Sequence, residues 1–253
     1  GGGAGGAAED SVRGVVPLGV PLTPDQEQSR GMLGDCWASL LSALSLLLHG
    51  TTDEACLQQA LRYLQILLYC CSRLSLEQAR DACLLQLTKY ALPGFSHETD
   101  SEATSGAGSH GSTSSGGLTL KNVLCFKALL HFCYDFGGLL GVAGWTIALR
   151  ALTGLERALQ KVSSAPSGLT IMRRGLDSLF ETTALLSQEA LADIIDAMGQ
   201  NMKGVSEIDE GIVVLNRLVE LCNFNVHRLL AVWDRVLRIV VGVCTSEGRG
   251  DLR

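Results

Sequence analysis

The sequence between residues 226 and 244 reads VHRLLAVWDRVLRIVVGVC. Its apolar residues recur at intervals of three and four, and its charged residues fall between them. The apolar set is Val226, Leu229, Leu230, Trp233, Val236, Leu237, Val240 and Cys244. This spacing predicts a helix roughly 28 Å long with one apolar face.

The same spacing runs through the rest of the chain in about nine segments, and no strand-like alternation competes with it. Three further stripes are Ile208, Ile212, Leu215, Leu218, Val219 and Cys222; Ile171, Gly175, Leu176, Leu179, Phe180 and Leu186; and Leu191, Ile194, Ile195 and Met198. The five prolines all lie outside these segments, so they do not break the predicted helices. The sequence therefore predicts an all-α fold.

Four short polar sequences are typical of helix starts. In each, a serine or threonine is followed three residues later by a side chain that reaches back to it. The pairs are Thr23 with Gln26, Thr51 with Glu54, Ser75 with Gln78, and Ser206 with Asp209. We expect helices to begin at these positions.

The helices can pack as a closed bundle or as an open row of helical hairpins. Hairpin starts near residues 24, 75, 143, 187 and 226 are compatible with the 40 to 47 residue period of HEAT and armadillo-like helical repeats. We favour the open row, an α-solenoid, because the last helix has a full apolar stripe and no following partner. The missing partner would be the next repeat, so we expect the chain to be truncated there.

Composition divides the chain into five parts. We expect a disordered N-terminal segment at 1–22, helical repeats at 23–95 and 118–244, and a polar tail at 245–253. Between the repeats, residues 96–117 consist mainly of serine, threonine and glycine without a large hydrophobe. Such a segment buries too little apolar surface to fold, which predicts a disordered insertion.

Charge and cysteine content exclude several classes of protein. The net charge is −6 with no basic block, which disfavours a nucleic-acid-binding protein. The longest uncharged run, Cys36 to Thr52, carries serines, threonines and a histidine and falls short of a typical membrane span. The nine cysteines are odd in number, lack CxxC spacing and lie mostly among apolar residues, which indicates reduced core thiols of an intracellular protein.

Candidate reactive residues do not form a recognisable catalytic or metal-binding pattern. His131 and Cys133 are two positions apart and point to different sides of a helix. Cys222 and His227 lack the close ligand pairs of structural zinc sites. We therefore expect no enzyme activity, no cofactor and no metal.

Other noticeable residues have structural interpretations. The carboxylates of Glu189, Asp193 and Asp196 lie opposite an apolar stripe, as on a solvated helix face. The glycines at 137, 138, 141 and 144 predict a turn between helices, and the three tryptophans, Trp37, Trp145 and Trp233, are expected to anchor the core. The remaining candidate is a basic interaction surface of Arg228, Arg235 and Arg238 for an acidic partner or an anionic lipid.

Three stretches resemble the large Golgi Arf guanine-nucleotide exchange factor family. Residues 36–48 (CWASLLSALSLLL), with Thr52-Asp53-Glu54, are similar to its helical-repeat region. Residues 120–130 (LKNVLCFKALL), with Gly144, Trp145 and Leu149, are similar to its monensin-sensitivity branch, which lacks the Sec7 catalytic domain. The third match comprises Leu179-Phe180-Glu181, Leu185, Leu218-Val219-Glu220, Asn225 to Arg228, and Trp233. The glycine- and serine-rich insertion and residues 185–205 depart from the family pattern.

This resemblance implies a cytoplasmic protein, peripheral on trans-Golgi and endosome membranes, that acts in vesicle-mediated protein transport. Its implied role is that of a scaffold in endosome-to-Golgi recycling, with Dopey-type scaffolds and Arf or Arf-like GTPases as partners. One alternative is the regulatory repeat region of an exchange factor whose Sec7 domain lies elsewhere. Another is a repeat protein of the nuclear-transport or phosphatase-scaffold type.

Overall fold

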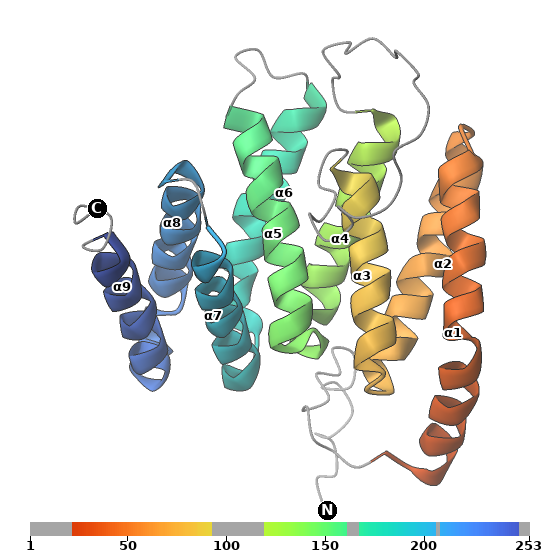
Figure 1. The fold of residues 1–253 in the computed structure, drawn as a ribbon, viewed down its shortest axis with the longest axis horizontal. Helices are drawn as coiled ribbons and strands as arrows, with labels where there is room; N and C mark the ends of the chain where they lie inside the picture. The colour runs from red at the N-terminus through yellow and green to blue at the C-terminus, as the bar shows by residue number, and fades with distance from the viewer. Residues whose placement is uncertain (1–21, 93–118, 161–166, 206–207, 248–253) are drawn as a thin grey trace, which may run out of the picture.

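The computed structural model describes residues 22–92, 119–160, 167–205 and 208–247 (Figure 1). These ranges contain nine α-helices and no strand, which confirms the all-α prediction. The helices are α1 (Pro24–Gly50), α2 (Glu54–Arg73), α3 (Glu77–Ala91), α4 (Leu120–Phe136), α5 (Gly141–Gln160), α6 (Ser167–Thr182), α7 (Gln188–Lys203), α8 (Ile208–Phe224) and α9 (Trp233–Glu247). Three short 3₁₀ helices join them: η1 (Gly137–Leu139), η2 (Thr183–Leu185) and η3 (Val226–Val232).

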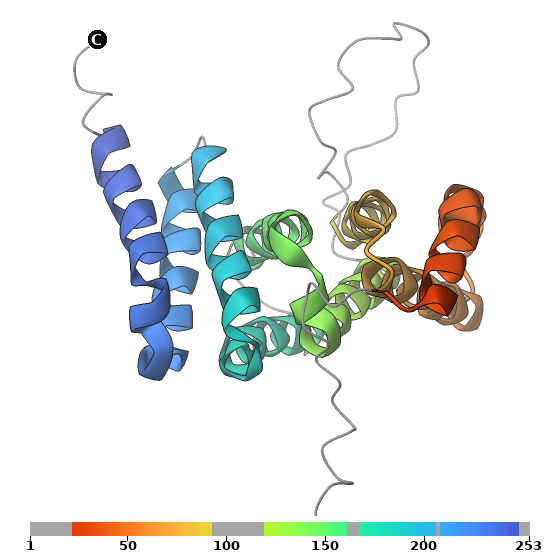
Figure 2. The same cartoon turned by 90° about the horizontal axis from the view of Figure 1, so that it is seen from below.

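The helices form two rows that pack against each other. One row contains α1, α3, α5, α7 and α9, and the other contains α2, α4, α6 and α8; each helix contacts its neighbours within its row. The α1 and α9 helices lie at opposite ends of the molecule (Figures 1 and 2). The helices thus form the predicted open row of hairpins, an α-solenoid, rather than a closed bundle.

The predicted hairpin starts are close to the observed ones. The helices of the odd-numbered row begin at residues 24, 77, 141 and 188, against predictions near 24, 75, 143 and 187. The fifth predicted start, 226, begins η3, and α9 follows only at residue 233. The single helix predicted from residue 226 is therefore wrong in its first two turns, and α9 extends to Glu247.

The predicted domain ranges fall partly outside the described residues. The insertion at 96–117 lies wholly outside them, as does the N-terminal segment apart from Leu22. Their predicted disorder stays a prediction.

Helix capping follows the prediction at one of the three start signals that the structure describes. The Gln26 amide donates to Thr23 Oγ1 at 3.3 Å, and the Thr23 amide donates to Gln26 Oε1 at 2.9 Å. Thr51 was the wrong cap for α2, because Asp53 lies nearer the helix and accepts the Cys56 amide at 2.8 Å. Ser75 was also wrong, since it turns the chain at a φ of 54° and α3 begins after Leu76 without a side-chain cap. The fourth signal, at Ser206, lies outside the described residues.

The predicted glycine turn joins α4 to α5. Gly141 has a φ of +59°, a conformation that other residues adopt at a steric cost. Beside it, Trp145 Nε1 donates to the carbonyl oxygen of Gly137 at 3.0 Å. A Cβ at Gly144 would lie 3.2 Å from Leu84 Cδ1, so its absence allows α5 to approach α3 closely.

The core contains most, but not all, of the residues expected in it. The stripes of α6 and α7 are confirmed by the burial of Leu176, Leu179, Leu191 and Ile195, among others. The α8 stripe is wrong in part: Leu218 is buried as predicted, but Ile212 and Val219 are exposed, and Val213, Val214 and Leu221 are buried in their place. Since apolar residues cover more than half of the circumference of α8, its sequence could not select the inner face.

The tryptophans and cysteines also divide between core and surface. Trp145 is 1% exposed and Trp37 packs against the core, as predicted, but Trp233 is 46% exposed. All nine cysteines are free thiols. Cys71, Cys83, Cys125 and Cys133 are buried as expected, while Cys36, Cys56 and Cys244 are exposed, contrary to the prediction of core positions.

Among the described helices, α1 alone has the length and apolar composition of a membrane span, with a mean hydropathy of 1.5 over 18 residues. One such helix is weak evidence for a span. Its inner side chains, Leu33, Trp37, Leu41 and Leu44, pack against the protein core, and it contacts α2 and α3.

Candidate functional site

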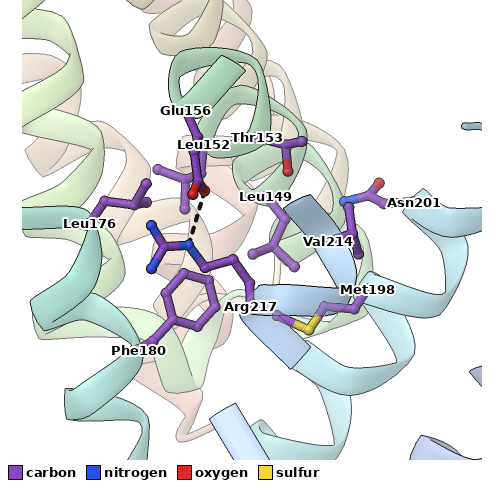
Figure 3. A pocket seen from close by; sticks show the side chains of 10 residues that line it. All are labelled: Leu149, Leu152, Thr153, Glu156, Leu176, Phe180, Met198, Asn201, Val214 and Arg217. Carbon is purple, nitrogen blue, oxygen red and sulfur yellow. Dashed lines mark hydrogen bonds and ion pairs between the residues drawn. The ribbon is translucent and has the colours of Figure 1, made fainter. Parts of the chain in front are cut away.

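A small hollow, partly open to solvent, lies where α5, α6, α7 and α8 meet (Figure 3). Most of its lining is apolar, and the polar part centres on one arginine of α8. The lining residues are Leu149, Leu152, Thr153, Glu156, Leu176, Phe180, Met198, Asn201, Val214 and Arg217.

Arg217 is 7% exposed and is held by three carboxylates from three helices. Its Nε donates to Glu156 Oε2 of α5 at 2.9 Å. Its Nη1 donates to Asp177 Oδ1 of α6 at 2.9 Å and to Glu220 Oε2 of α8 at 2.6 Å. The guanidinium also lies over the Phe180 ring, 5.2 Å from the centroid, which adds a cation–π contact.

The electrostatics of this hollow fix Arg217 in its charged form. Burial alone would lower the pKa of the guanidinium, but its bonds to Glu156 and then to Glu220 and Asp177 outweigh burial and raise it. The group therefore stays protonated at any physiological pH and cannot act as an acid or a base. Its geometry is that of a junction that ties α5, α6 and α8 together.

Asn201, a second polar residue of the hollow, is also paired within the protein. Asn201 Oδ1 accepts a hydrogen bond from Arg150 Nε at 3.1 Å, and its Nδ2 donates to the Thr146 carbonyl oxygen at 3.3 Å. Throughout the described residues, no buried side-chain nitrogen or oxygen lacks a hydrogen-bond partner. The hollow thus offers an apolar wall and no unpaired buried group to orient a substrate.

The predicted basic surface of Arg228, Arg235 and Arg238 divides into three different environments. Arg228 Nη2 donates to the Thr183 carbonyl oxygen at 2.6 Å, its Nη1 donates to the Leu186 carbonyl oxygen, and it also bonds Asn225 Oδ1. Arg235 forms an ion pair with Asp196 of α7. Arg228 therefore joins η3 to η2, and Arg235 joins α9 to α7.

Arg238 is the exposed member of this set, and its Nε donates to the Asp234 carbonyl oxygen at 3.3 Å. The structure does not bring the three arginines together as one free surface. Binding of an acidic partner or an anionic lipid at this surface stays a prediction.

The other candidate residues from the sequence analysis do not come together as a catalytic or metal-binding site within the described residues. Burial raises the pKa of Asp193, with Glu189 adding to the rise and Arg235 and Arg80 opposing it. His131 is exposed and Cys133 is buried, so the two lie on different sides of α4 as expected. Within the described ranges, no group of three or more His, Cys, Asp or Glu side chains is placed to hold a metal ion.

Sequence reasoning missed Arg217 and Asn225. Arg217 lies three residues after Val214 and four before Leu221, so it shares a helix face with these two buried residues. A charged residue on an inner helix face was the signal that could have identified it. Asn225, fully buried, donates through Nδ2 to Thr183 Oγ1 at 2.9 Å. It lies in a short connection whose conformation no helical pattern specifies.

Comparison with known proteins identifies relatives by sequence alone. No protein-family model and no solved structure matches the chain. The curated relatives include three described as "Protein MON2 homolog". Those of Xenopus laevis and Homo sapiens are each 24% identical, over 271 and 272 aligned residues, and that of Drosophila melanogaster is 22% identical over 285.

Each match covers 84% of this chain but only 16% or 17% of the relative. The chain therefore spans about one sixth of the length of these relatives. The predicted resemblance to the monensin-sensitivity branch is confirmed at the level of distant homology. The chain is a distant homologue of the MON2 proteins.

Proposed function

We propose that this chain is a non-enzymatic helical-repeat scaffold that acts in vesicle trafficking between endosomes and the Golgi. The observation that carries the proposal is the homology to MON2 proteins over 84% of the chain. The fold supports it, because a row of stacked hairpins presents long outer surfaces to partners. Arg217 and Asn201 of the hollow are bonded to side chains of other helices, which also fits a scaffold.

The partners proposed from the family resemblance are Dopey-type scaffolds and Arf or Arf-like GTPases. Binding would take place on exposed helix faces, and the protein would lie peripherally on trans-Golgi and endosome membranes. The exposed Arg238 near the α9 end is one candidate contact for an acidic partner surface. The similarity to MON2 proteins favours a trafficking scaffold. The alternative, in which the chain is the regulatory repeat region of a Sec7-containing exchange factor, is less favoured.

Affinity purification of the tagged full chain from cytosol tests these partners. We expect it to recover Dopey-type scaffolds and Arf-like GTPases. Arg238→Glu should lower the recovery at least about fivefold, because it reverses an exposed charge at the proposed contact.

Arg62→Glu is the matched control, since it also reverses an exposed charge, on α2 at the other end of the molecule. Recovery of transport receptors or phosphatase subunits without Golgi proteins would contradict the proposed function. Equal losses with both variants would contradict the contact at Arg238.

A further inference from the structure

Two cations on neighbouring helices in the middle of the array, Lys127 of α4 and Arg174 of α6, are exposed. Neither forms a hydrogen bond or an ion pair with another residue in the part of the chain that the structure describes. Arg157 and Arg235, by contrast, each pair with a carboxylate of another helix. Because Lys127 and Arg174 are unpaired, they can bind an external anion without giving up an internal contact.

The two cations occupy equivalent positions in consecutive helices of the even-numbered row. Lys127 is seven residues after the first residue of α4, and Arg174 is seven residues after the first residue of α6. The two helices run in the same direction and contact each other. They approach closely at Gly175, since a Cβ there would lie 2.8 Å from Leu130 Cδ1. The two cations therefore lie at nearly the same level along the helix axes.

The contacts of Tyr134 show that both cations are on the same side of the helix pair. Tyr134 is two turns after Lys127 on one stripe of α4, and its hydroxyl donates to a backbone carbonyl oxygen of α6 at 2.5 Å. Burial raises the pKa of Tyr134, a hydrogen bond with Ser178 lowers it, and the charge of Glu181 raises it. Ser178 and Glu181 follow Arg174 by one and two turns. The stripe of α6 that carries Arg174 therefore lies beside the stripe of α4 that carries Lys127.

The charge around this pair is positive, although the whole chain has a net charge of −6. Residues 119–134, which include nearly all of α4, contain no aspartate or glutamate, and neither do residues 167–176 at the start of α6. The first carboxylate of α6, Asp177, is bonded to Arg217. We call Lys127 and Arg174 together the α4–α6 cation pair.

The spacing of the cation pair fits an extended acidic peptide. The axes of packed helices are about 8 to 10 Å apart, and side chains at alternate residues of an extended chain are about 7 Å apart on one side. The long side chains of lysine and arginine can bridge the difference. One acidic segment that crosses from α4 to α6 can therefore pair with both cations at once.

An anionic membrane is a poorer match for the same surface. Polybasic membrane contacts use clusters of about four to eight cations. Here Asp135 and Glu181, both exposed, follow Lys127 and Arg174 by eight and seven residues on the same two helices. A bilayer broad enough to cover this face would bring its anionic head groups against these carboxylates.

We propose that the α4–α6 cation pair binds an extended acidic segment of a partner protein, with carboxylates at alternate residues. The ammonium group of Lys127 and the guanidinium group of Arg174 each pair with one carboxylate. This surface is separate from the contact proposed at Arg238, and the inference does not depend on the proposed trafficking function.

Fluorescence anisotropy of a labelled peptide tests the site. The peptide is about 12 residues long, alternates glutamate with serine, and is titrated with the full chain at about 50 mM salt, where screening is moderate. We expect saturable binding with a Kd of about 10 to 100 μM, as for a contact that rests on few charges. The same peptide with glutamine in place of glutamate should bind at least about tenfold more weakly.

Variants of the two cations locate the binding site. Lys127→Glu and Arg174→Glu should each weaken peptide binding at least about tenfold, whereas Lys127→Arg keeps the charge and should bind within about twofold of the unmodified chain. Lys89→Glu is the matched control, because it makes the same change in net charge at an exposed lysine of α3, in the other row. Circular dichroism with unchanged helix content and melting temperature verifies that each variant is folded.

Three results would overturn the proposal. The unmodified chain would not bind the acidic peptide; or the glutamine peptide would bind equally well; or Lys89→Glu would weaken binding as much as Lys127→Glu and Arg174→Glu, as expected if net charge alone mattered. A chain that ignores the peptide but binds vesicles of phosphatidylserine and phosphatidylcholine, and loses this binding with Arg174→Glu, would assign the surface to a membrane instead.

Discussion

Arg217 of α8 and Glu156 of α5 form a buried ion pair with an Nε to Oε2 distance of 2.9 Å. The side chain of Arg217 is 9% exposed and that of Glu156 is 18% exposed, so solvent screens this pair less than the outer contacts to Asp177 and Glu220. The two residues are 61 positions apart. Their contact joins one hairpin to the next, in addition to the apolar packing that runs through the row.

Replacing Arg217 should therefore destabilise the fold. We expect Arg217→Ala to lower the free energy of unfolding by about 2 to 3 kcal/mol, because it leaves Glu156 desolvated without its partner. Urea denaturation followed by circular dichroism measures this change. Glu220→Gln, which alters a carboxylate that is 44% exposed, should cost less than about 1 kcal/mol. Equal costs for the two variants would contradict the role assigned to the buried pair.

Substitution of Asn225 should also lower the free energy of unfolding substantially. It is fully buried, donates to Thr183 Oγ1 at 2.9 Å and to the Leu221 carbonyl oxygen at 2.8 Å, and accepts from Arg228. Asn225→Ala removes all four bonds, two of which come from Arg228 Nε and Nη2, and should lower the free energy of unfolding by about 2 to 3 kcal/mol. The exposed Asn223 provides the control, since Asn223→Ala should change stability by no more than about 0.5 kcal/mol. A neutral Asn225→Ala would mean that η2 and η3 are held together by other contacts.

The contribution of Asp193 to folding stability should depend on pH, in a direction that its raised pKa determines. Burial raises its pKa above the ordinary value of 3.8, so the folded state binds its proton more tightly than the unfolded state does. This group adds stability at low pH and loses that contribution as pH rises through the raised pKa. Asp193→Asn should thus melt at a higher temperature than the unmodified chain at pH 7.

The difference in melting temperature should shrink as pH falls through the raised pKa of Asp193 and vanish below about 3.8, where the carboxyl is neutral in both states. Asp35→Asn removes the same charge from an exposed site and corrects for the change in net charge. An Asp193→Asn variant that is less stable at pH 7 would show that the attraction of Arg235 and Arg80 exceeds the cost of burial.

Thiol reactivity should separate the cysteines by exposure. Burial raises the pKa of both Cys125 and Cys133 to about 12, so neither forms much reactive thiolate near pH 8. An aromatic disulfide reagent should modify the three exposed cysteines, Cys36, Cys56 and Cys244, rapidly in the native protein and all nine in urea. Cys36→Ser should reduce the rapid class from three to two. Rapid native reaction of Cys133 would contradict the packing of α4.

The architecture could be predicted from sequence because it depends on repeated local signals. The stripe of Leu191, Ile194, Ile195 and Met198 occupies one side of α7, and its polar residues occupy the other, so the inner face was unambiguous. Gly141 at positive φ marks the turn between α4 and α5 for the same local reason.

The errors arose where more than one local solution was available. In α8, apolar residues cover more than half of the circumference, so Ile212 and Val219 were assigned to the core although Val213 and Val214 occupy it. Before α2, both Thr51 and Asp53 could cap a helix, and the acid adjacent to the first turn does so. The pairing of Arg217 with its carboxylates could not be predicted, because these groups come from α5, α6 and α8 and meet only in the folded row.

Imaging the tagged full chain in cells, with and without a Golgi-disrupting treatment, most directly tests the central claim of a trafficking scaffold. We predict that it overlaps trans-Golgi and endosome markers and disperses when the Golgi is disrupted. Staining that stays diffuse or nuclear, unchanged by the treatment, would contradict the proposed function.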